Sequence, residues 1–378
     1  MPLVSAPKIK ENRKNKSETI FDWGILKDKK FLEGLKKVSA VMFGKNGILT
    51  EGKPKLVETI SLDSALSSSI DLQDGPAVLR AAVLSSDGEI KKNTESHEIR
   101  GRAIERAILE EALASGLLPE DLNRRGFKQL GRINFNGHFV GNLYEESSWP
   151  NKIYFSGNPE MLLNQASHIY RKGEKFKKSL LWQEILLKNL KEKMSLGNSV
   201  VGVSFREVGW KNVEIEENYL NDSVFVGFLV FKDSLREDVV SHLIDLKNKG
   251  VKIIFATGEN AHSAHGLMKN AGLHNDEVQI ITGEDFSSLS DADIFGALNR
   301  QTVFGRLSPA HKMRISQVLQ DRGETVLYIG TEHNDLPAIL SANIGVALSS
   351  GEQFAQDASD IIVKDEHLPI FLKIRAEV

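Results

Sequence analysis

The sequence predicts an α/β fold, a doubly wound parallel sheet interrupted by an inserted α+β domain. From residue 224 onward, strand-length apolar runs alternate with amphipathic helix-length segments, which indicates a parallel sheet covered by helices. One more apolar run, Ser39–Phe43, lies far upstream and most simply belongs to the same sheet. The region between them has its own mixed pattern of helices and short strands. It is therefore interpreted as an insertion.

Composition excludes several classes of protein. The chain has 378 residues, enough for two to three domains at about 150 residues each. Lys plus Arg number 48 and Asp plus Glu 51, a balance that argues against nucleic-acid binding through bulk charge. Cysteine is absent, which excludes disulfides and thiol chemistry. No apolar run reaches the 18 residues or so of a membrane span.

These patterns predict four segments. Residues 1–24 are expected to form a basic, disordered tail. Residues 25–57 and 224–378 are expected to form one discontinuous domain, and residues 58–223 the inserted domain.

The elements are predicted in chain order. In the inserted domain, apolar spacing predicts three helices, at Gly75–Ser85, Ile99–Ala114 and Lys177–Lys193. Short strands are predicted between residues 133 and 155. In the discontinuous domain, strands are predicted at Val224–Phe231, Val251–Ala256, Gln301–Phe304, Thr325–Ile329, Ile344–Ala347 and Asp360–Val363. Helices are predicted between them at Arg236–Lys249, Ala261–Ala271, Pro309–Arg322 and Leu336–Ala342.

Loops at the carboxyl ends of the predicted strands carry the polar residues, where ligands of such sheets bind. They are Gly44–Thr50, Phe231–Arg236, Ala256–Asn260, Arg306–Lys312 and Gly330–Pro337. Small residues, hydroxyls, one lysine and one aspartate meet there. That combination is typical of a phosphate pocket, in which backbone N–H groups and a lysine hold the anion.

The same loops carry a family resemblance. Met42–Lys53 resembles V-F-D-K-T-G-T-L-T-E-G-K, Thr257–Glu259 resembles T-G-D, Phe304–Lys312 resembles F-A-R-V-S-P-x-x-K, Ile329–Pro337 resembles T-G-D-G-V-N-D-A-P and Ala342–Leu348 resembles A-D-I-G-I-A-M. In the insertion, Gly101–Ala107 resembles G-D-P-T-E-R-A and Ser156–Glu160 resembles K-G-A-P-E. In this order they resemble the cytosolic phosphorylation and nucleotide-binding domains of P-type cation-transporting ATPases, of the calcium and sodium/potassium pump branch of the haloacid-dehalogenase superfamily.

This resemblance implies a Rossmannoid haloacid-dehalogenase-like phosphorylation (P) domain with an inserted nucleotide-binding (N) domain, and Mg²⁺ and ATP as family ligands. It covers about residues 25 to 366.

The phosphorylation motifs are degenerate. The family aspartate that forms the aspartyl phosphate corresponds to Gly44, and covalent catalysis by a carboxylate is impossible without it. The first Mg²⁺-binding aspartate of the hinge corresponds to Thr331, a poor ligand for a hard cation. Asp335 remains as a weak remnant of the metal site, while Asn46 and Ile48 replace two threonines. No catalytic residue or metal site is therefore expected to be intact.

The nucleotide motifs are degenerate too. Ser156 replaces the family lysine of the adenine pocket, and Ser199 replaces an arginine that reaches the ATP phosphates. Phe135 keeps the aromatic that stacks on adenine, and Gly157 keeps the motif glycine. ATP and Mg²⁺ binding is predicted to be weak or lost, and no cofactor is expected.

Part of the pocket survives, as the residues Thr50, Thr257, Gly258, Arg236, Lys312, Asn334 and Asp335. Two interpretations remain open. In the first, the surviving residues hold an anion. In the second, they hold the loops together, with Lys312 paired to Asp335.

The sequence thus predicts a soluble, degenerate P-type ATPase-like protein, a pseudoenzyme that acts as a binding or regulatory module. The expected location is cytoplasmic, peripheral at the membrane through a membrane protein or a true pump as partner, with no nucleic acid. Two alternatives are the cytosolic part of a split or truncated pump and a weak phosphatase of the haloacid-dehalogenase type. Gly44 argues against the phosphatase, because nearly all phosphoryl chemistry of the superfamily passes through the missing aspartate.

Overall fold

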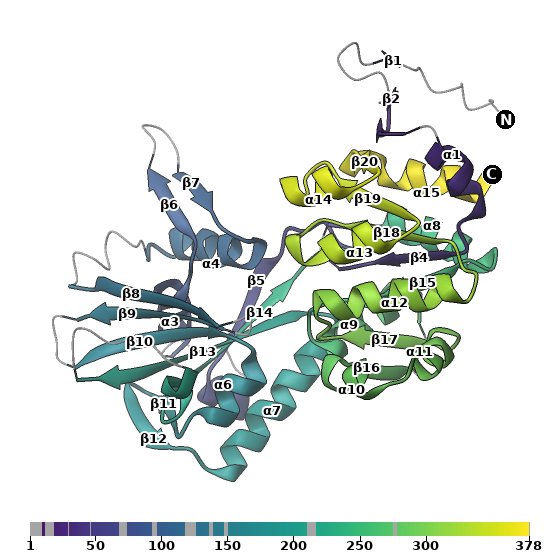
Figure 1. The fold of residues 1–378 in the computed structure, drawn as a ribbon. Coiled ribbons are helices and arrows are strands. Elements are labelled where there is room, and N and C mark those ends of the chain that lie inside the picture. The colour runs from purple at the N-terminus through teal and green to yellow at the C-terminus, as the bar shows by residue number, and fades with distance from the viewer. Residues whose placement is uncertain are drawn as a thin grey trace. The chain divides into compact units, whose positions relative to one another are not determined.

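The computed structural model describes residues 10–11, 19–28, 30–45, 47–67, 74–92, 97–117, 126–135, 139–146, 150–209, 217–274 and 278–377. Its contacts divide the chain into two compact units. Unit 1 comprises Met1–Gly52 and Ser234–Val378, and unit 2 comprises Lys53–Asp233. Figure 1 shows both units and labels most of their elements.

Unit 1 is built on an eight-stranded sheet with a parallel centre. Its strands, in spatial order, are β1 (Lys10–Glu11), β2 (Thr19–Phe21), β3 (Gly24–Leu26), β20 (Ile361–Val363), β19 (Ile344–Leu348), β18 (Val326–Gly330), β4 (Ala40–Phe43) and β15 (Lys252–Phe255). The last five pair in parallel with one another, and β1 to β3 pair antiparallel at one edge. Beyond β15, a bridge between Ala256 and Phe304 links the parallel pair β16 (Gln279–Thr282) and β17 (Thr302–Gly305).

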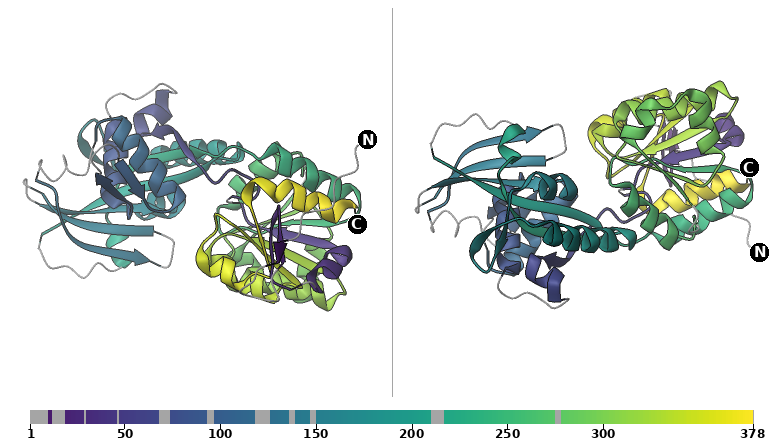
Figure 2. Two further views of the ribbon diagram at one scale, coloured as in Figure 1. Left: turned by 90° about the horizontal axis from the view of Figure 1, so that it is seen from above. Right: turned by 90° about the horizontal axis from the view of Figure 1, so that it is seen from below.

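Helices cover both faces of this sheet. One face packs against α1 (Lys30–Lys37), α8 (Glu237–Asn248), α9 (Ala261–Asn270) and α15 (Leu368–Glu377). The other packs against α10 (Gly283–Ser288), α11 (Asp291–Leu298), α12 (Pro309–Asp321), α13 (Leu336–Ser341) and α14 (Gln353–Ala358). Figure 2 shows α15, in yellow, lying beside α8.

Both faces of this sheet must be covered because its strands carry apolar side chains on both sides, as β4 shows. Its side chains alternate between the two faces, so that Val41 and Phe43 enter one apolar core and Ala40 and Met42 the other. All four are buried, as expected for a central strand of a parallel sheet. The predicted α/β class, with Ser39–Phe43 in the same sheet as the C-terminal strands, is confirmed.

Part of the predicted tail belongs to the fold. Thr19–Phe21 and Gly24–Leu26 form a hairpin whose second strand pairs with β20. Trp23 is buried, stacks on Phe21 at a ring-centroid distance of 4.7 Å and also contacts Phe371 of α15. The prediction of a tail through residue 24 was wrong for these residues, because their apolar side chains cover the end of the core. Residues 1–9 and 12–18 lie outside the described part of the chain.

Unit 2 is a mixed sheet with helices on both faces. Its strands, in order, are β12 (Glu174–Lys177), β11 (His168–Arg171), β14 (Val224–Lys232), β13 (Ser199–Val208), β10 (Asn151–Gly157), β9 (Phe139–Glu145) and β8 (Lys128–Phe135), and β5 (Lys55–Ile60) also pairs with β14. One face packs against α3 (Gly75–Ser85) and α4 (Ala103–Ala114). The other packs against α2 (Leu62–Ser67), α6 (Pro159–Gln165) and α7 (Leu180–Ser195). A hairpin, β6 (Glu89–Lys92) and β7 (His97–Arg100), precedes α4.

Two predicted elements differ from the structure. Val224–Phe231 was predicted as a strand of the discontinuous domain, but β14 lies inside the sheet of unit 2, paired with β13, β11 and β5. Both faces of β14 are covered by helices, so its continuous apolar run resembles that of a parallel-sheet strand. The helix predicted from Ile99 begins at Ala103, because Glu105 Oε2 accepts a hydrogen bond from Arg102 N at 2.8 Å and fixes the helix start there.

Candidate functional site

The residues singled out in unit 1 meet at the carboxyl ends of the parallel strands. Gly44 follows β4, Thr257 and Gly258 follow β15, and Thr331 follows β18. Lys312 lies in the first turn of α12, which begins where the Ser308 hydroxyl accepts a hydrogen bond from His311 N. Sequence reasoning therefore placed this group at the correct edge of the sheet.

Gly44 leaves space where a side chain could stand. A Cβ atom built on it would lie 3.9 Å from Asp335 Oδ1 and 4.0 Å from the carbonyl oxygen of Ala256, both ordinary contact distances. Thus glycine is not required here by crowding. The position faces the Asp335 carboxylate, and it offers no nucleophile of its own.

Lys312 and Asp335 form a buried ion pair. Lys312 Nζ lies 2.7 Å from Asp335 Oδ1, and both side chains are less than a tenth exposed. This is the pairing that the structural interpretation of Lys312 predicted. Its ammonium group is therefore engaged by a carboxylate within the protein.

Asp335 is held by further donors. The Tyr328 hydroxyl donates to Oδ1 at 2.7 Å, and the N–H groups of Thr331 and Glu332 donate to Oδ2 at 3.0 and 3.2 Å. Burial raises the pKa of the Asp335 carboxyl, but the Lys312 ammonium and these hydrogen bonds outweigh burial, so its pKa is lowered. The carboxylate is ionised and surrounded by donors.

Sequence reasoning missed Tyr328. It is fully buried in β18, and burial together with the Asp335 carboxylate raises its pKa well above the usual value, so the hydroxyl keeps its proton and donates. The available signal was one hydroxyl in an otherwise apolar strand, Val326–Gly330, because a buried tyrosine usually requires a hydrogen-bond partner.

A second ion pair lies beside Gly44. Lys45 is 4% exposed, and its Nζ lies 2.8 Å from Glu259 Oε2. Glu259 belongs to the Thr257–Glu259 loop, where the buried Thr257 hydroxyl accepts a hydrogen bond from Glu259 N at 3.1 Å. This motif has glutamate where the family has aspartate, and the longer Glu259 side chain reaches the buried Lys45.

The remaining surviving residues differ in surroundings. Thr50 is buried and donates to the Lys45 carbonyl at 3.4 Å, and Arg236 donates to the carbonyls of Gly47 and Asp365. Both fasten loops of unit 1 to one another. Asn334 is exposed, and Gly258 is exposed beside Leu307. Asn46 lies outside the described residues.

The residues present do not fit a Mg²⁺ site of the family type. Within the described parts of the chain, no three His, Asp or Glu side chains gather as metal ligands. Asp335 already accepts from Lys312, Tyr328 and two backbone N–H groups, and Thr331 offers only a hydroxyl. Mg²⁺ demands several oxygen ligands in octahedral geometry, which this set does not supply.

The positions that the family resemblance assigns to the nucleotide fall in unit 2. Phe135 ends β8, and backbone pairing aligns it with Phe139 of β9 and Gly157 of β10 in one row across three strands. The side chain of Phe135 lies outside the described residues. Ser156 is buried in β10 opposite Val203, whereas Ser199 begins β13 opposite Phe231. None of these positions carries a cation.

The fold and the position of the loops define the class of this protein, an α/β protein with a largely parallel sheet covered by helices on both faces and a second unit inserted into it. The haloacid dehalogenase-like hydrolase family matches residues 38–343, and the chain belongs to that family.

Its relatives are P-type ion-transporting ATPases. The chain is 25% identical over 354 residues to calcium-transporting ATPase 1 of Lactococcus lactis, covering 91% of this chain and 39% of the relative. It is 30% identical over 181 residues to an endoplasmic reticulum-type calcium-transporting ATPase 3 of Arabidopsis thaliana (47% of this chain, 18% of the relative), and 27% identical over 242 residues to a P-type magnesium-transporting ATPase of Escherichia coli (63% and 26%). The chain therefore spans at most about two fifths of the length of these relatives. Within the described residues, no helix has the length and apolar character needed to cross a bilayer.

Proposed function

We propose that this chain is a catalytically degenerate P-type ATPase-like module that binds or regulates a partner and does not transfer phosphate. The main observation is Gly44, at the position of the family nucleophile, next to a carboxylate that is already paired with Lys312. A covalent phosphoenzyme needs a carboxylate at the end of β4, and removing a nucleophile of this kind costs about 10⁴–10⁶ in rate.

The two internal ion pairs support this proposal. In a phosphoryl-transfer site, lysines are directed at the transferring group, where they stabilise developing charge. Here Lys45 and Lys312 each lie within 2.8 Å of a protein carboxylate oxygen. An incoming phosphate would have to compete with both carboxylates.

The partner and location are further parts of the proposal. The relatives are ion-transporting ATPases by name, so a membrane protein, such as a true pump, is the proposed partner. The module would then be cytoplasmic and held at the membrane through that partner.

The experiment is a calorimetric titration of the whole chain with ATP and with Mg-ATP, together with a thermal-shift measurement. We expect no heat of binding and no shift of the melting temperature at millimolar nucleotide. Micromolar binding of Mg-ATP would contradict the proposal for the nucleotide site and would make unit 2 a sensor. A p-nitrophenyl phosphate assay tests the phosphatase alternative, and turnover that is lost in a Lys312→Met variant shown to be folded by circular dichroism would favour it.

One observation favours a second candidate. The match covers 91% of this chain but 39% of the Lactococcus relative, as it would if this chain were the cytosolic ATP-binding part of a split or truncated pump. That function requires phosphorylation of the chain, so a phosphoenzyme measurement separates the two candidates.

A further inference from the structure

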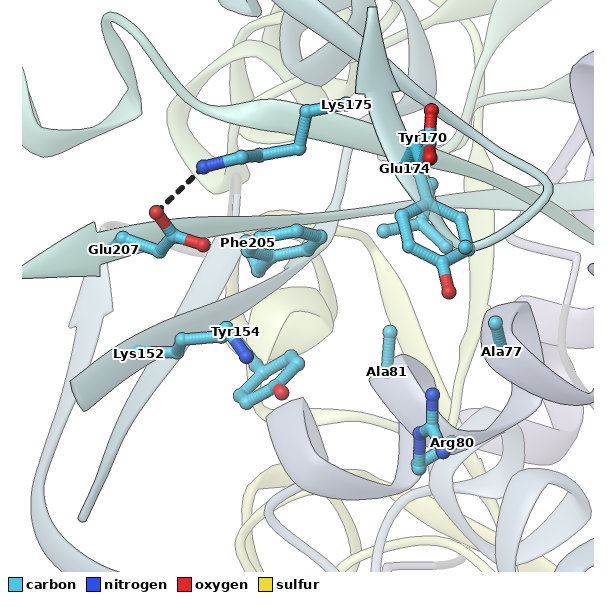
Figure 3. Close-up of a pocket in the computed structure, with 12 residues that line it drawn as sticks. Ala77, Arg80, Ala81, Lys152, Tyr154, Tyr170, Glu174, Lys175, Phe205 and Glu207 are labelled. Carbon is cyan, nitrogen blue, oxygen red and sulfur yellow. Dashed lines mark hydrogen bonds and ion pairs between the residues drawn. The ribbon is translucent and has the colours of Figure 1, made fainter. Parts of the chain in front are cut away.

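Unit 2 contains an open pocket that none of the nucleotide positions lines. Its volume is about 540 Å³, and it lies between α3 and the β10, β13, β14 and β11 end of the sheet (Figure 3). Ser156 and Ser199 are not among the residues that line it. The pocket is therefore a different site from the degenerate nucleotide site.

Three aromatic side chains form its sheet wall. Tyr154 of β10 lies directly opposite Phe205 of β13, with ring centroids 6.1 Å apart. Tyr170 of β11 meets the other side of Phe205 edge to face, at 6.2 Å. Figure 3 shows the three rings around one space. A row of rings of this kind offers stacking and edge contacts to a planar ring.

Helix α3 leaves that space open. Ala77 and Ala81 are one turn apart and face the rings from the helix, where larger side chains would fill the pocket. Tyr154 and Phe205 are only 7% and 8% exposed, so a ligand ring would pack against a surface that is already largely shielded from water.

The charged side chains of the pocket favour an anion at the edge that Arg80 lines. Lys152 pairs with Glu146 at 2.8 Å, and Lys175 pairs with Glu207 at 2.6 Å, so these two cations are neutralised. Arg80 forms no ion pair or hydrogen bond with any residue that the structure describes. In Figure 3 it lies away from Glu174 and Glu207, so neither carboxylate neutralises its edge of the pocket.

We propose that this pocket binds a small aromatic anion, with its ring against Tyr154, Phe205 and Tyr170 and its anionic group on Arg80. A guanidinium presents its donors in a planar fork that matches a carboxylate, sulfonate or phosphate. The site is independent of the proposed function, since none of its residues belongs to the phosphorylation or nucleotide motifs.

The test uses 8-anilinonaphthalene-1-sulfonate, an aromatic anion whose fluorescence rises on binding. We expect saturable binding to the whole chain. Arg80→Gln should weaken it about tenfold, the loss expected when one charge-assisted hydrogen bond is removed. Arg106→Gln, on the exposed face of neighbouring α4, is the matched control and should leave the affinity unchanged.

Two further measurements separate the ring from the charge. N-phenyl-1-naphthylamine, the same ring system without the sulfonate, should bind Arg80→Gln and the wild type equally. Ala77→Phe, which fills the pocket and keeps Arg80, should abolish binding of both probes while circular dichroism shows a folded chain. Equal affinities of the sulfonate for Arg80→Gln and Arg106→Gln would overturn the proposal, and so would unchanged binding in a folded Ala77→Phe variant.

Discussion

Lys312 Nζ lies 2.7 Å from Asp335 Oδ1 in the interior of unit 1, where both side chains are less than a tenth exposed. The carboxylate that could have remained a metal ligand is thus the counter-ion of the lysine that could have held a phosphate. This contact makes both side chains part of the buried structure of unit 1.

The pair should matter for stability. Lys312→Met leaves the buried Asp335 carboxylate without its cation, and breaking a buried pair in this way costs about 3–5 kcal/mol. Arg314→Met on the same helix breaks the exposed pair with Asp291 and should cost at most about 1 kcal/mol. Urea denaturation measures both. Because the cost comes from an unpaired charge, adding Asp335→Asn to Lys312→Met should recover a large part of it, and equal costs for the two single variants would contradict the account.

The Lys45–Glu259 contact predicts a gain of binding. Glu259→Gln removes the carboxylate at 2.8 Å from Lys45 Nζ, so the buried ammonium gains affinity for an anion. Titration with inorganic phosphate should show tighter binding to Glu259→Gln than to the wild type, by several-fold. Glu284→Gln, an exposed carboxylate in α10, serves as the control for a change of net charge. Identical phosphate affinities in the Glu259 variant and the wild type would show that this pair does not compete with an anion.

Introducing cationic side chains at two positions of unit 2 should increase its affinity for ATP. Ser156→Lys combined with Ser199→Arg places two positive charges where the family resemblance implies them, and each charged hydrogen bond contributes about 1.5–3 kcal/mol. Calorimetry should therefore show ATP binding at least about tenfold tighter than that of the wild type. Ser195→Lys, an exposed serine of α7, adds charge elsewhere in the unit and should have no effect. An unchanged ATP affinity in the double variant would mean that the nucleotide positions are wrongly aligned.

His274 predicts a pH dependence of stability. Burial, with Lys247 and His265 nearby, lowers its pKa from 6.5 to about 4, and its Nδ1 has no partner among the described residues. Between these values the unfolded chain binds more protons than the folded chain, so the free energy of unfolding falls as the pH drops through this window.

Replacing this histidine should flatten that dependence. Denaturation of His274→Leu from pH 6.5 to pH 4 should show a smaller loss of stability than the wild type. His262→Leu, at an exposed position of α9, should keep the wild-type slope. Parallel curves for His274→Leu and the wild type would contradict the assignment.

The sequence predicted unit 1 well because its loops and strands carry strong local signals. Ser39–Phe43 was assigned to the sheet from its apolar run alone, and the structure places Ala40–Phe43 inside the sheet as β4, between β18 and β15. Lys312 was placed with Asp335 because both follow carboxyl ends of parallel strands. Gly44 was aligned with the family aspartate because Phe43, Lys45, Gly47, Leu49 and Thr50 around it match the family motif.

Other features could not be predicted from local patterns. An apolar run covered on both faces has the same appearance in a parallel and a mixed sheet, so β14 was assigned to the wrong unit. Phe21 stacks on Trp23, and Trp23 packs against Phe371 of α15, more than 340 residues away in sequence, so their place in the core could not be predicted from neighbouring residues. The contact of Lys45 with Glu259 and the row of Tyr154, Phe205 and Tyr170 depend on tertiary pairing that no spacing reveals.

The central claim is that the chain forms no phosphoenzyme, and acid-quenched labelling with γ-labelled ATP and Mg²⁺ tests it most directly. A P-type pump labelled in parallel sets the sensitivity, and Gly44→Ala sets the background. We predict that the wild type incorporates no more acid-stable phosphate than Gly44→Ala, because no carboxylate stands at the end of β4. Stoichiometric, hydroxylamine-labile phosphate on the wild-type chain would contradict the account.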